Sequence, residues 1–254
     1  MWESYWDDPW VLAEWPLLRR RRLSGSDVRV RTTGDGIAVR IPADGFESVL
    51  VAGSEVAESV EELTAGSDRV LVMGEVAPQV REALEARGLE ERRQWDWYSV
   101  DQDCDPTDTT VELLEDPGEV QALLLGSYPL ADRRTSTNGR WWGIHRDAML
   151  VAAGAADTWR GHGVDGTVDW NSHLRSFTVH HDFRGEGIGM AVFAQMLFEE
   201  WRRTGWVQWS TWVDSPETTG LMRSLGLEPQ VRVTNFRPRG HASSRTGYPG
   251  AETA

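Results

Sequence analysis

Residues 180–182, two histidines and an aspartate, stand directly before a glycine-rich segment, and these residue types move protons and bind anions. Imidazole titrates in the range that suits a general base. The segment that follows, RGEGIG, has the pattern Arg184-x-x-Gly187-x-Gly189. Glycine lets backbone N–H groups approach a ligand with no Cβ in the way, and a helix that begins at such a turn directs its free amides to the same point. The pattern therefore predicts a nest for a phosphate or pyrophosphate group.

A strand and a helix must position this segment. The run SFTV before it is β-like, and residues 189–205 after it place apolar side chains at helical spacing. These flanking elements favour a binding site over a glycine-rich turn with no ligand. Two other phosphate motifs are excluded, because a Walker loop needs a lysine, which the chain lacks, and a dinucleotide fingerprint needs a different order of glycines.

The composition favours a cytoplasmic protein. No apolar run approaches the ~18 residues of a membrane span, and the acidic, Trp-rich N-terminus is unlike a signal peptide. Cys104 is the only cysteine, so intramolecular disulfides are excluded. The formal net charge of -14 argues against a nucleic-acid partner, because phosphate binding needs concentrated positive charge. The charge suits an amine substrate, although a solvated acidic surface explains it as well.

Two segments of the chain are similar in order and spacing. Residues 70–100 (VLVMGEVAPQVREALEARGLEERRQWDWYSV) and 207–238 (VQWSTWVDSPETTGLMRSLGLEPQVRVTNFRP) both run strand, helix, then Gly-Leu-Glu into a final strand. We infer degenerate copies of one fold, with two unrelated α/β modules as the alternative. An Asp-rich stretch near residue 105 marks the boundary. The predicted domains are residues 1–104 and 105–237, and residues 238–254 have too little apolar content to order themselves.

The same patterns predict the individual elements. In the first half we expect a helix, or a helix broken at Pro9 and Pro16, from residue 2 to a solvated turn at 19–22. We also expect helices at 54–66 and 77–88, and strands at 27–32, 36–42, 48–53, 68–74 and 89–100. In the second half we expect helices at 118–128, 189–205 and 215–226, and strands at 139–147, 149–159, 173–180, 206–213 and 227–238. The first helix carries Trp2, Trp6, Trp10 and Trp15, which favour core packing over a ligand cage.

Residues 118–237 resemble the GNAT family of acyl-coenzyme A (acyl-CoA) N-acyltransferases. Arg184, Gly187 and Gly189 match its Q/R-x-x-G-x-G/A signature, FTV resembles its fourth strand, and LMRSLGLEP resembles its LYxxLGFxx segment. The resemblance implies an α/β (α+β) fold with a mixed central sheet flanked by helices. Residues 27–100 resemble the later part of the same fold but lack the signature. We therefore expect a tandem arrangement with a degenerate N-terminal GNAT-like domain and one active site per chain.

The resemblance also implies a cofactor site for acetyl-CoA and no metal. The backbones of Phe177, Thr178 and Val179 would lie against the pantetheine arm, with the Val179 amide polarising the thioester carbonyl. The pyrophosphate would be bound at Arg184, Gly185, Glu186, Gly187, Ile188, Gly189 and Met190.

The catalytic residues depart from the family pattern. Met222 stands where the family usually has a tyrosine acid, and a thioether donates no proton. Ser215 stands where an asparagine is frequent. Three interpretations stay open: the thiolate leaves unaided, Ser215 or a water protonates it, or the site binds acyl-CoA without turnover. His180 is our candidate for the base, with a surface histidine pair as the alternative.

Other reactive residues have weaker context. Asp165, Asp169 and His173 fall in the segment between two strands, where an exposed polar hairpin is favoured over an acceptor site or a metal clip. Tyr128 and the loop after it stand where the family admits acceptors. Cys104 lacks any partner motif for a nucleophile.

The leading hypothesis is an N-acetyltransferase that transfers the acetyl group of acetyl-CoA to a small amine or an amino-acid-like metabolite. The alternatives are a catalytically silent acyl-CoA sensor, and a transferase that uses a longer acyl-CoA or an aminoacyl-tRNA. The expected partner is the amine alone, with neither nucleic acid nor membrane. The oligomeric state stays open, a homodimer being one option.

Overall fold

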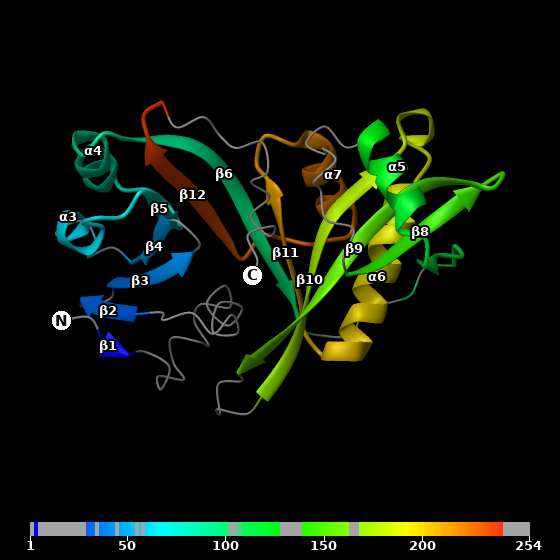
Figure 1. The fold of residues 1–254 in the computed structure, drawn as a ribbon, viewed down its shortest axis with the longest axis horizontal. Helices are drawn as coiled ribbons and strands as arrows, with labels where there is room; N and C mark the ends of the chain where they lie inside the picture. The colour runs from blue at the N-terminus through cyan, green and yellow to red at the C-terminus, as the bar shows by residue number, and fades with distance from the viewer. Residues whose placement is uncertain are drawn as a thin grey trace.

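The computed structural model describes residues 3–4, 29–33, 36–43, 46–53, 56, 59–101, 106, 108–127, 139–162 and 168–240. Within these residues twelve strands form one sheet, in the order β1-β2-β3-β4-β5-β12-β6-β11-β10-β9-β8-β7 (Figure 1). No helix in this part of the chain combines the length and the apolar character that a membrane span requires.

The first half follows the predicted order closely. Its elements are β1 Glu3–Ser4, β2 Arg29–Thr33, β3 Gly36–Ala43, β4 Phe46–Ala52, α3 Val60–Leu63, β5 Arg69–Met73, α4 Pro78–Ala86 and β6 Leu89–Val100. The helix predicted at 54–66 is shorter, since α3 is a single turn. The prediction of a helix from residue 2 is wrong at Glu3–Ser4, which instead pair with the outer edge of β2. The tryptophans at 2, 6, 10 and 15 lie outside the described residues.

The second half also keeps its predicted elements. They are β7 Glu112–Leu114, α5 Pro117–Ser127, β8 Arg140–Arg146, β9 Met149–His162, β10 Val168–Val179, the short 3₁₀ turn His181–Phe183, α6 Ile188–Thr204, β11 Val207–Trp212, α7 Pro216–Ser224 and β12 Val231–Pro238. β9 and β10 are longer than predicted and remain paired as far as His162 and Val168. Asp169 and His173 therefore lie in a strand rather than in an exposed hairpin, because the antiparallel ladder continues to satisfy the backbone.

The two halves exchange their last strands. β6, from the first half, lies between β11 and β12 and pairs antiparallel with both. β12, from the second half, pairs antiparallel with β5 and β6. Both copies of the repeated segment are thus strand, helix and strand, and the final strand of each completes the sheet of the other. The boundary between residues 104 and 105 stays a prediction, because the sheet is continuous across the two halves.

Separate apolar clusters pack the helices on the sheet. α3 and α4 cover one cluster of the first half, α5 packs on β8 and β9, and α6 and α7 cover the central strands of the second half. Side chains alternate along β6, so Tyr98 and Val100 lie on the face that α6 covers, while Trp95 and Trp97 lie on the other.

Candidate functional site

β10 and β11 separate from each other after only two paired residues. Ser172 pairs with Val207 and His173 pairs with Gln208, in parallel register, and the strands then part. A one-residue bulge in β10 between Arg175 and Thr178 adds to the divergence. Ser176 at this bulge has a φ of 52°, a left-handed conformation that a serine adopts only at some cost. The sheet consequently contains an open wedge between two of its central strands.

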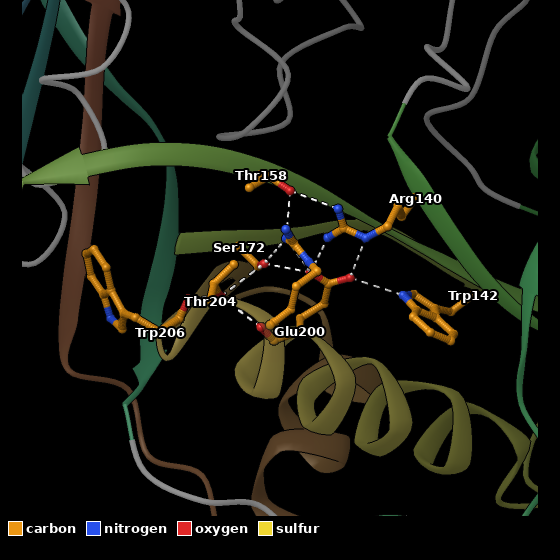
Figure 2. A network of polar contacts seen from close by, with 8 residues as sticks. Arg140, Trp142, Thr158, Ser172, Glu200, Thr204 and Trp206 are labelled. Carbon is orange, nitrogen blue, oxygen red and sulfur yellow. Dashed lines mark hydrogen bonds and ion pairs between the residues drawn. The ribbon is translucent and has the colours of Figure 1, made fainter. Parts of the chain in front are cut away.

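A buried carboxylate fixes the narrow end of this wedge (Figure 2). Glu200 of α6 is 1% exposed and accepts hydrogen bonds from Ser172 (2.6 Å), the Arg140 Nε (2.9 Å) and the Arg203 Nη2 (2.9 Å). The Oε1 atom, which accepts from the Arg140 Nε, also accepts a hydrogen bond from the Trp142 indole N–H. Burial raises the pKa of Glu200, but the hydrogen bonds from Arg140, Ser172 and Arg203 outweigh burial and hold it below its usual value. Ser172 is one of the two β10 residues that pair with β11, so this network holds α6 against the point where the two strands part.

A cavity of about 30 Å³ lies inside the wedge. That volume is close to the share of one water molecule in the liquid, so a group of a few heavy atoms fits there. The lining comes from both strands, α6 and α7: Leu174, Arg175, Phe177, Phe193, Met196, Trp209, Ser210, Thr211, Thr218, Leu221 and Met222.

Backbone groups of β10 point into the wedge at alternate residues. The His180 N–H donates to the Val151 carbonyl of β9 at 2.8 Å. Because successive backbone groups of a strand point to opposite edges, those of Thr178 also point to β9, whereas those of Phe177 and Val179 point to the open edge. The Val179 carbonyl accepts from the Arg184 Nε at 3.1 Å, which agrees with this direction.

The glycine segment joins β10 to the N-terminus of α6. Gly185 and Gly187 have φ values of 83° and 78°, and no atom within 4 Å would meet a Cβ at either position. Gly189 has a different requirement, since a Cβ there would lie 3.2 Å from Val179 Cγ2 and 3.3 Å from Phe177. Among the hydrogen bonds of the described residues, none uses the amides of residues 185–190 as donors. We call these amides, together with the positive end of the α6 dipole beside the wedge, the anion nest; that an anion binds there stays a prediction.

Solved structures with this arrangement of strands have one fold in common. An acetyltransferase of the GNAT family from Colwellia psychrerythraea matches with a TM-score of 0.56 at 10% identity, over 90% of this chain and 97% of that chain. A GCN5-related N-acetyltransferase from Kribbella flavida matches with a TM-score of 0.52 at 15% identity, over 92% and 96%. The protein has the GNAT fold. No protein-family model and no curated protein matches the chain.

In this GNAT fold the Arg184 side chain acts as a brace. Its Nη2 donates to the Ser127 carbonyl at the end of α5 (3.0 Å), and its Nε donates to Val179. The guanidinium thus ties the glycine segment to two neighbouring elements. The sequence predicted that Arg184 binds an anion. Through these two contacts Arg184 orients the backbone of the glycine segment, and direct contact with an anion stays a prediction.

His180 lies on the face opposite α6, because Phe177 and Val179 pack against the α6 cluster and side chains alternate. Its Nδ1 accepts the Asp182 N–H at 3.4 Å, which leaves Nε2 to face outward. Donor atoms of His180, His181 and Asp182 lie within 4.8 Å of one another, but His181 and Asp182 are exposed and pair with each other at 3.1 Å.

Met222, at the position of the family's usual acid, and Ser215, a candidate proton donor, differ in their relation to the cavity. Met222 is buried in the cavity lining, and its sulfur accepts the Trp209 indole N–H at 3.1 Å. Ser215 is the N-cap residue of α7, and its hydroxyl lies 2.8 Å from the Thr218 hydroxyl. Thr218 contributes to the cavity lining and Ser215 does not.

Sequence reasoning missed the contribution of β6. Tyr98 stacks on Trp209 at 5.4 Å between ring centroids, and burial raises the pKa of its phenol. Spacing along the chain carries no signal for this contact, because β6 belongs to the other half. Of the remaining candidates, Cys104, Tyr128, Asp165 and the side chain of Asp169 lie outside the described residues, and His173 is buried against Trp97.

Proposed function

We propose that the protein is an acyl-CoA-dependent N-acyltransferase that acts on a small-molecule amine, with acetyl-CoA as donor. The observation that carries this proposal is the open wedge between β10 and β11 directly beside the anion nest of residues 185–190. An extended chain with a pyrophosphate at one end and a thioester at the other suits both features together. The GNAT fold adds an analogy, since a fold by itself does not determine a reaction.

Residues of this chain fit each part of acyl-CoA. The amides of Gly185, Glu186, Gly187, Ile188, Gly189 and Met190 would hold the pyrophosphate, with Arg184 bracing the loop. The open-edge backbone groups of Phe177 and Val179 would pair with the amides of the pantetheine arm. Thr178 lies between them with its backbone turned to β9, which leaves it a packing role.

The chemistry is attack of a neutral amine on the thioester carbonyl. The Val179 N–H, which points to the open edge, would stabilise the oxyanion that develops there. A C–N bond forms and the C–S bond breaks, while one proton leaves the amine nitrogen and one reaches the thiolate. His180 is the candidate base for the first proton. Met222 supplies no proton to the second, and a thiol pKa of ~8.5 lets the thiolate leave near neutral pH without one.

The size of the cavity favours a short acyl group. At about 30 Å³ it has room for the methyl group of acetyl. The formal net charge of -14 counts against a tRNA-linked donor.

A silent acyl-CoA sensor is the second candidate. Two observations favour it: Met222 at the position of the usual acid, and Ser215 outside the cavity lining. Release of free thiol from acetyl-CoA with any amine of a broad panel decides between the two, because a sensor gives none.

A thermal shift with CoA, acetyl-CoA and longer acyl-CoAs tests the binding site. A ligand at 100 times its Kd stabilises the folded state by ~2.7 kcal/mol. Gly187→Asp should abolish the shift, because the carboxylate occupies the anion nest. Gly205→Asp is the matched control: Gly205 ends the same helix with φ and ψ of 72° and -8°, against 78° and -5° at Gly187. Both variants bear similar backbone strain, so an equal ligand shift in the two would contradict the proposed pyrophosphate site.

A further inference from the structure

Three tryptophans form a patch on the sheet face opposite α6, where Trp95 and Trp97 are buried in an apolar cluster and Trp212 packs against it. Trp95 and Trp97 are two residues apart on β6, and Trp212 of β11 is the ladder partner of Trp95. Partners in an antiparallel ladder point to the same face, and so do residues two apart on a strand. The Trp95 and Trp212 rings meet edge to face at 5.9 Å. The patch therefore lies where the strands of the two halves interleave, next to the wedge.

All three indole N–H groups of this patch are buried and have no hydrogen-bond acceptor among the described residues. The tryptophans on the α6 side differ, since Trp142 donates to Glu200 and Trp209 donates to the Met222 sulfur. Trp201, on α6 itself, is a further unpaired indole but lies away from this face. An unpaired buried donor is costly, and three on adjacent positions indicate a place for a ligand with hydrogen-bond acceptors.

Ser210 connects the cavity in the wedge with this patch. It is the ladder partner of Trp97, and it lines the cavity, which the three tryptophans do not. Its hydroxyl is also buried without a partner among the described residues. Most of the other lining residues, such as Phe193 and Met196, belong to the α6 side. The gap between β10 and β11 thus joins the α6 face to the tryptophan face.

The exposed edge of the patch carries a positive charge. The Arg93 guanidinium lies 4.9 Å from the centre of the Trp212 ring. This cation opposes the binding of a second cation on the same ring, which argues against an aromatic cage for an ammonium group. It favours a carboxylate, which a chain with a formal net charge of -14 would otherwise repel.

We propose that the acyl acceptor binds on this patch and is an amine that also carries a carboxylate, such as an amino acid. The indole N–H groups of Trp95, Trp97 and Trp212 and the Arg93 guanidinium hold the carboxylate. The amine enters the wedge past Ser210 and meets the thioester from the side opposite the anion nest. This assignment of substrate class rests on the proposed transferase function.

The test compares amino acids with the amines that remain when their carboxyl groups are removed. Free-thiol release from acetyl-CoA is measured for each pair with the intact protein, Arg93→Gln, Arg92→Gln and Trp97→Phe. Arg92 is the matched control: it is the adjacent exposed arginine, and it pairs with Glu90. We expect a KM about ten-fold or more lower for the amino acid of a pair, and loss of that preference in Arg93→Gln but not in Arg92→Gln.

A second readout is independent of turnover. ¹⁹F NMR of the 5-fluorotryptophan-labelled protein, with resonances assigned by Trp95→Phe, Trp97→Phe and Trp212→Phe, reports amino-acid binding without acyl-CoA. Trp170→Phe, at an exposed position of β10, checks the labelling. Selective shifts of the three resonances support the proposal.

Two kinds of failure are distinguishable. Equal turnover of both members of every pair, unchanged in Arg93→Gln, overturns the substrate class and leaves the transferase function intact. Absence of both thiol release and any acyl-CoA thermal shift overturns the transferase function itself. Amino-acid binding that shifts none of the three tryptophans overturns the location.

Discussion

Trp95 of β6 and Val233 of β12 face each other in an antiparallel pair. Each is the seventh residue after the glycine of the Gly-Leu-Glu that the two copies share. On either side of them Asp96 pairs with Arg232 and Gln94 pairs with Thr234. Equivalent positions therefore meet across an approximate two-fold axis within a single chain. The exchange of last strands follows from this symmetry, because β6 continues the sheet through β11 and β12 continues it through β5.

The exchanged strands predict that neither half is stable alone. Residues 1–104 expressed separately lack β12, and residues 105–254 lack β6, so each exposes unpaired strand edges in the centre of its sheet. We expect insoluble products from single expression and a stable complex from co-expression, measured by co-purification on a tag carried by one half. A folded monomer of either half would contradict this prediction. The intact chain cleaved between residues 104 and 105 serves as control and should keep its near-UV circular dichroism.

Replacement of Glu200, the buried carboxylate at the narrow end of the wedge, should strongly reduce the stability of the fold. Glu200→Gln removes the charge that Arg140 and Arg203 share and should lower the free energy of unfolding by about 3 kcal/mol. Glu199→Gln, one residue earlier and bonded only to Gln195 among the described contacts, should change it little. Denaturant midpoints of both variants give the comparison. Equal midpoints would show that the network is dispensable.

Acid should weaken the same network. The pKa of Glu200 is below its usual value of 4.5, so its contribution is present in full above about pH 4.5 and is lost as the pH falls through the folded-state pKa. We expect the loss of stability of the intact protein in this range to be smaller in Glu200→Gln. Thermal unfolding between pH 3 and pH 6 measures it, and parallel curves for the two proteins would contradict the assignment.

His145 predicts a pH dependence of the opposite sign. It pairs with Glu119 of α5 at 2.8 Å and with Glu112 of β7, and hydrogen bonds to these two carboxylates raise its pKa above 6.5. Its contribution is therefore present in full below pH 6.5 and is lost as the pH rises through the higher folded-state pKa. His145→Gln should flatten the fall of Tm above pH 6.5, whereas Glu115→Gln, an exposed carboxylate between the two partners in sequence, should not. Identical Tm profiles of wild type and His145→Gln would rule out this link.

The proposed proton-transfer roles predict different effects on kcat for variants of His180 and Ser215. His180→Gln should lower kcat by about 100-fold if His180 takes the proton of the amine. Ser215→Ala should leave kcat nearly unchanged, because Ser215 does not line the cavity and its hydroxyl pairs with the Thr218 hydroxyl. Steady-state kinetics with the best acceptor measures both. The reverse order of effects would transfer the proton-donor role to Ser215 and remove His180 from the mechanism.

The sequence by itself determined most of the elements and the glycine turn before α6. Period-two and helical patterns placed β2 to β6 and the helices from α4 onward, because local apolar spacing reports which face of each element is buried. Arg184, Gly187 and Gly189 marked the turn before α6, since positive φ and close helix packing each need glycine. The repeated segments indicated two related halves.

The tertiary structure alone decided which strands became neighbours. Strand pairing depends on contacts between residues more than 100 positions apart, and the spacing within each strand is the same whether β6 pairs with β5 or with β11. The exchange brings Tyr98, Trp95 and Trp97 of the first half beside the wedge of the second. The cofactor side of the proposed site was thus readable from one short segment, whereas its acceptor side exists only because the two halves share one sheet.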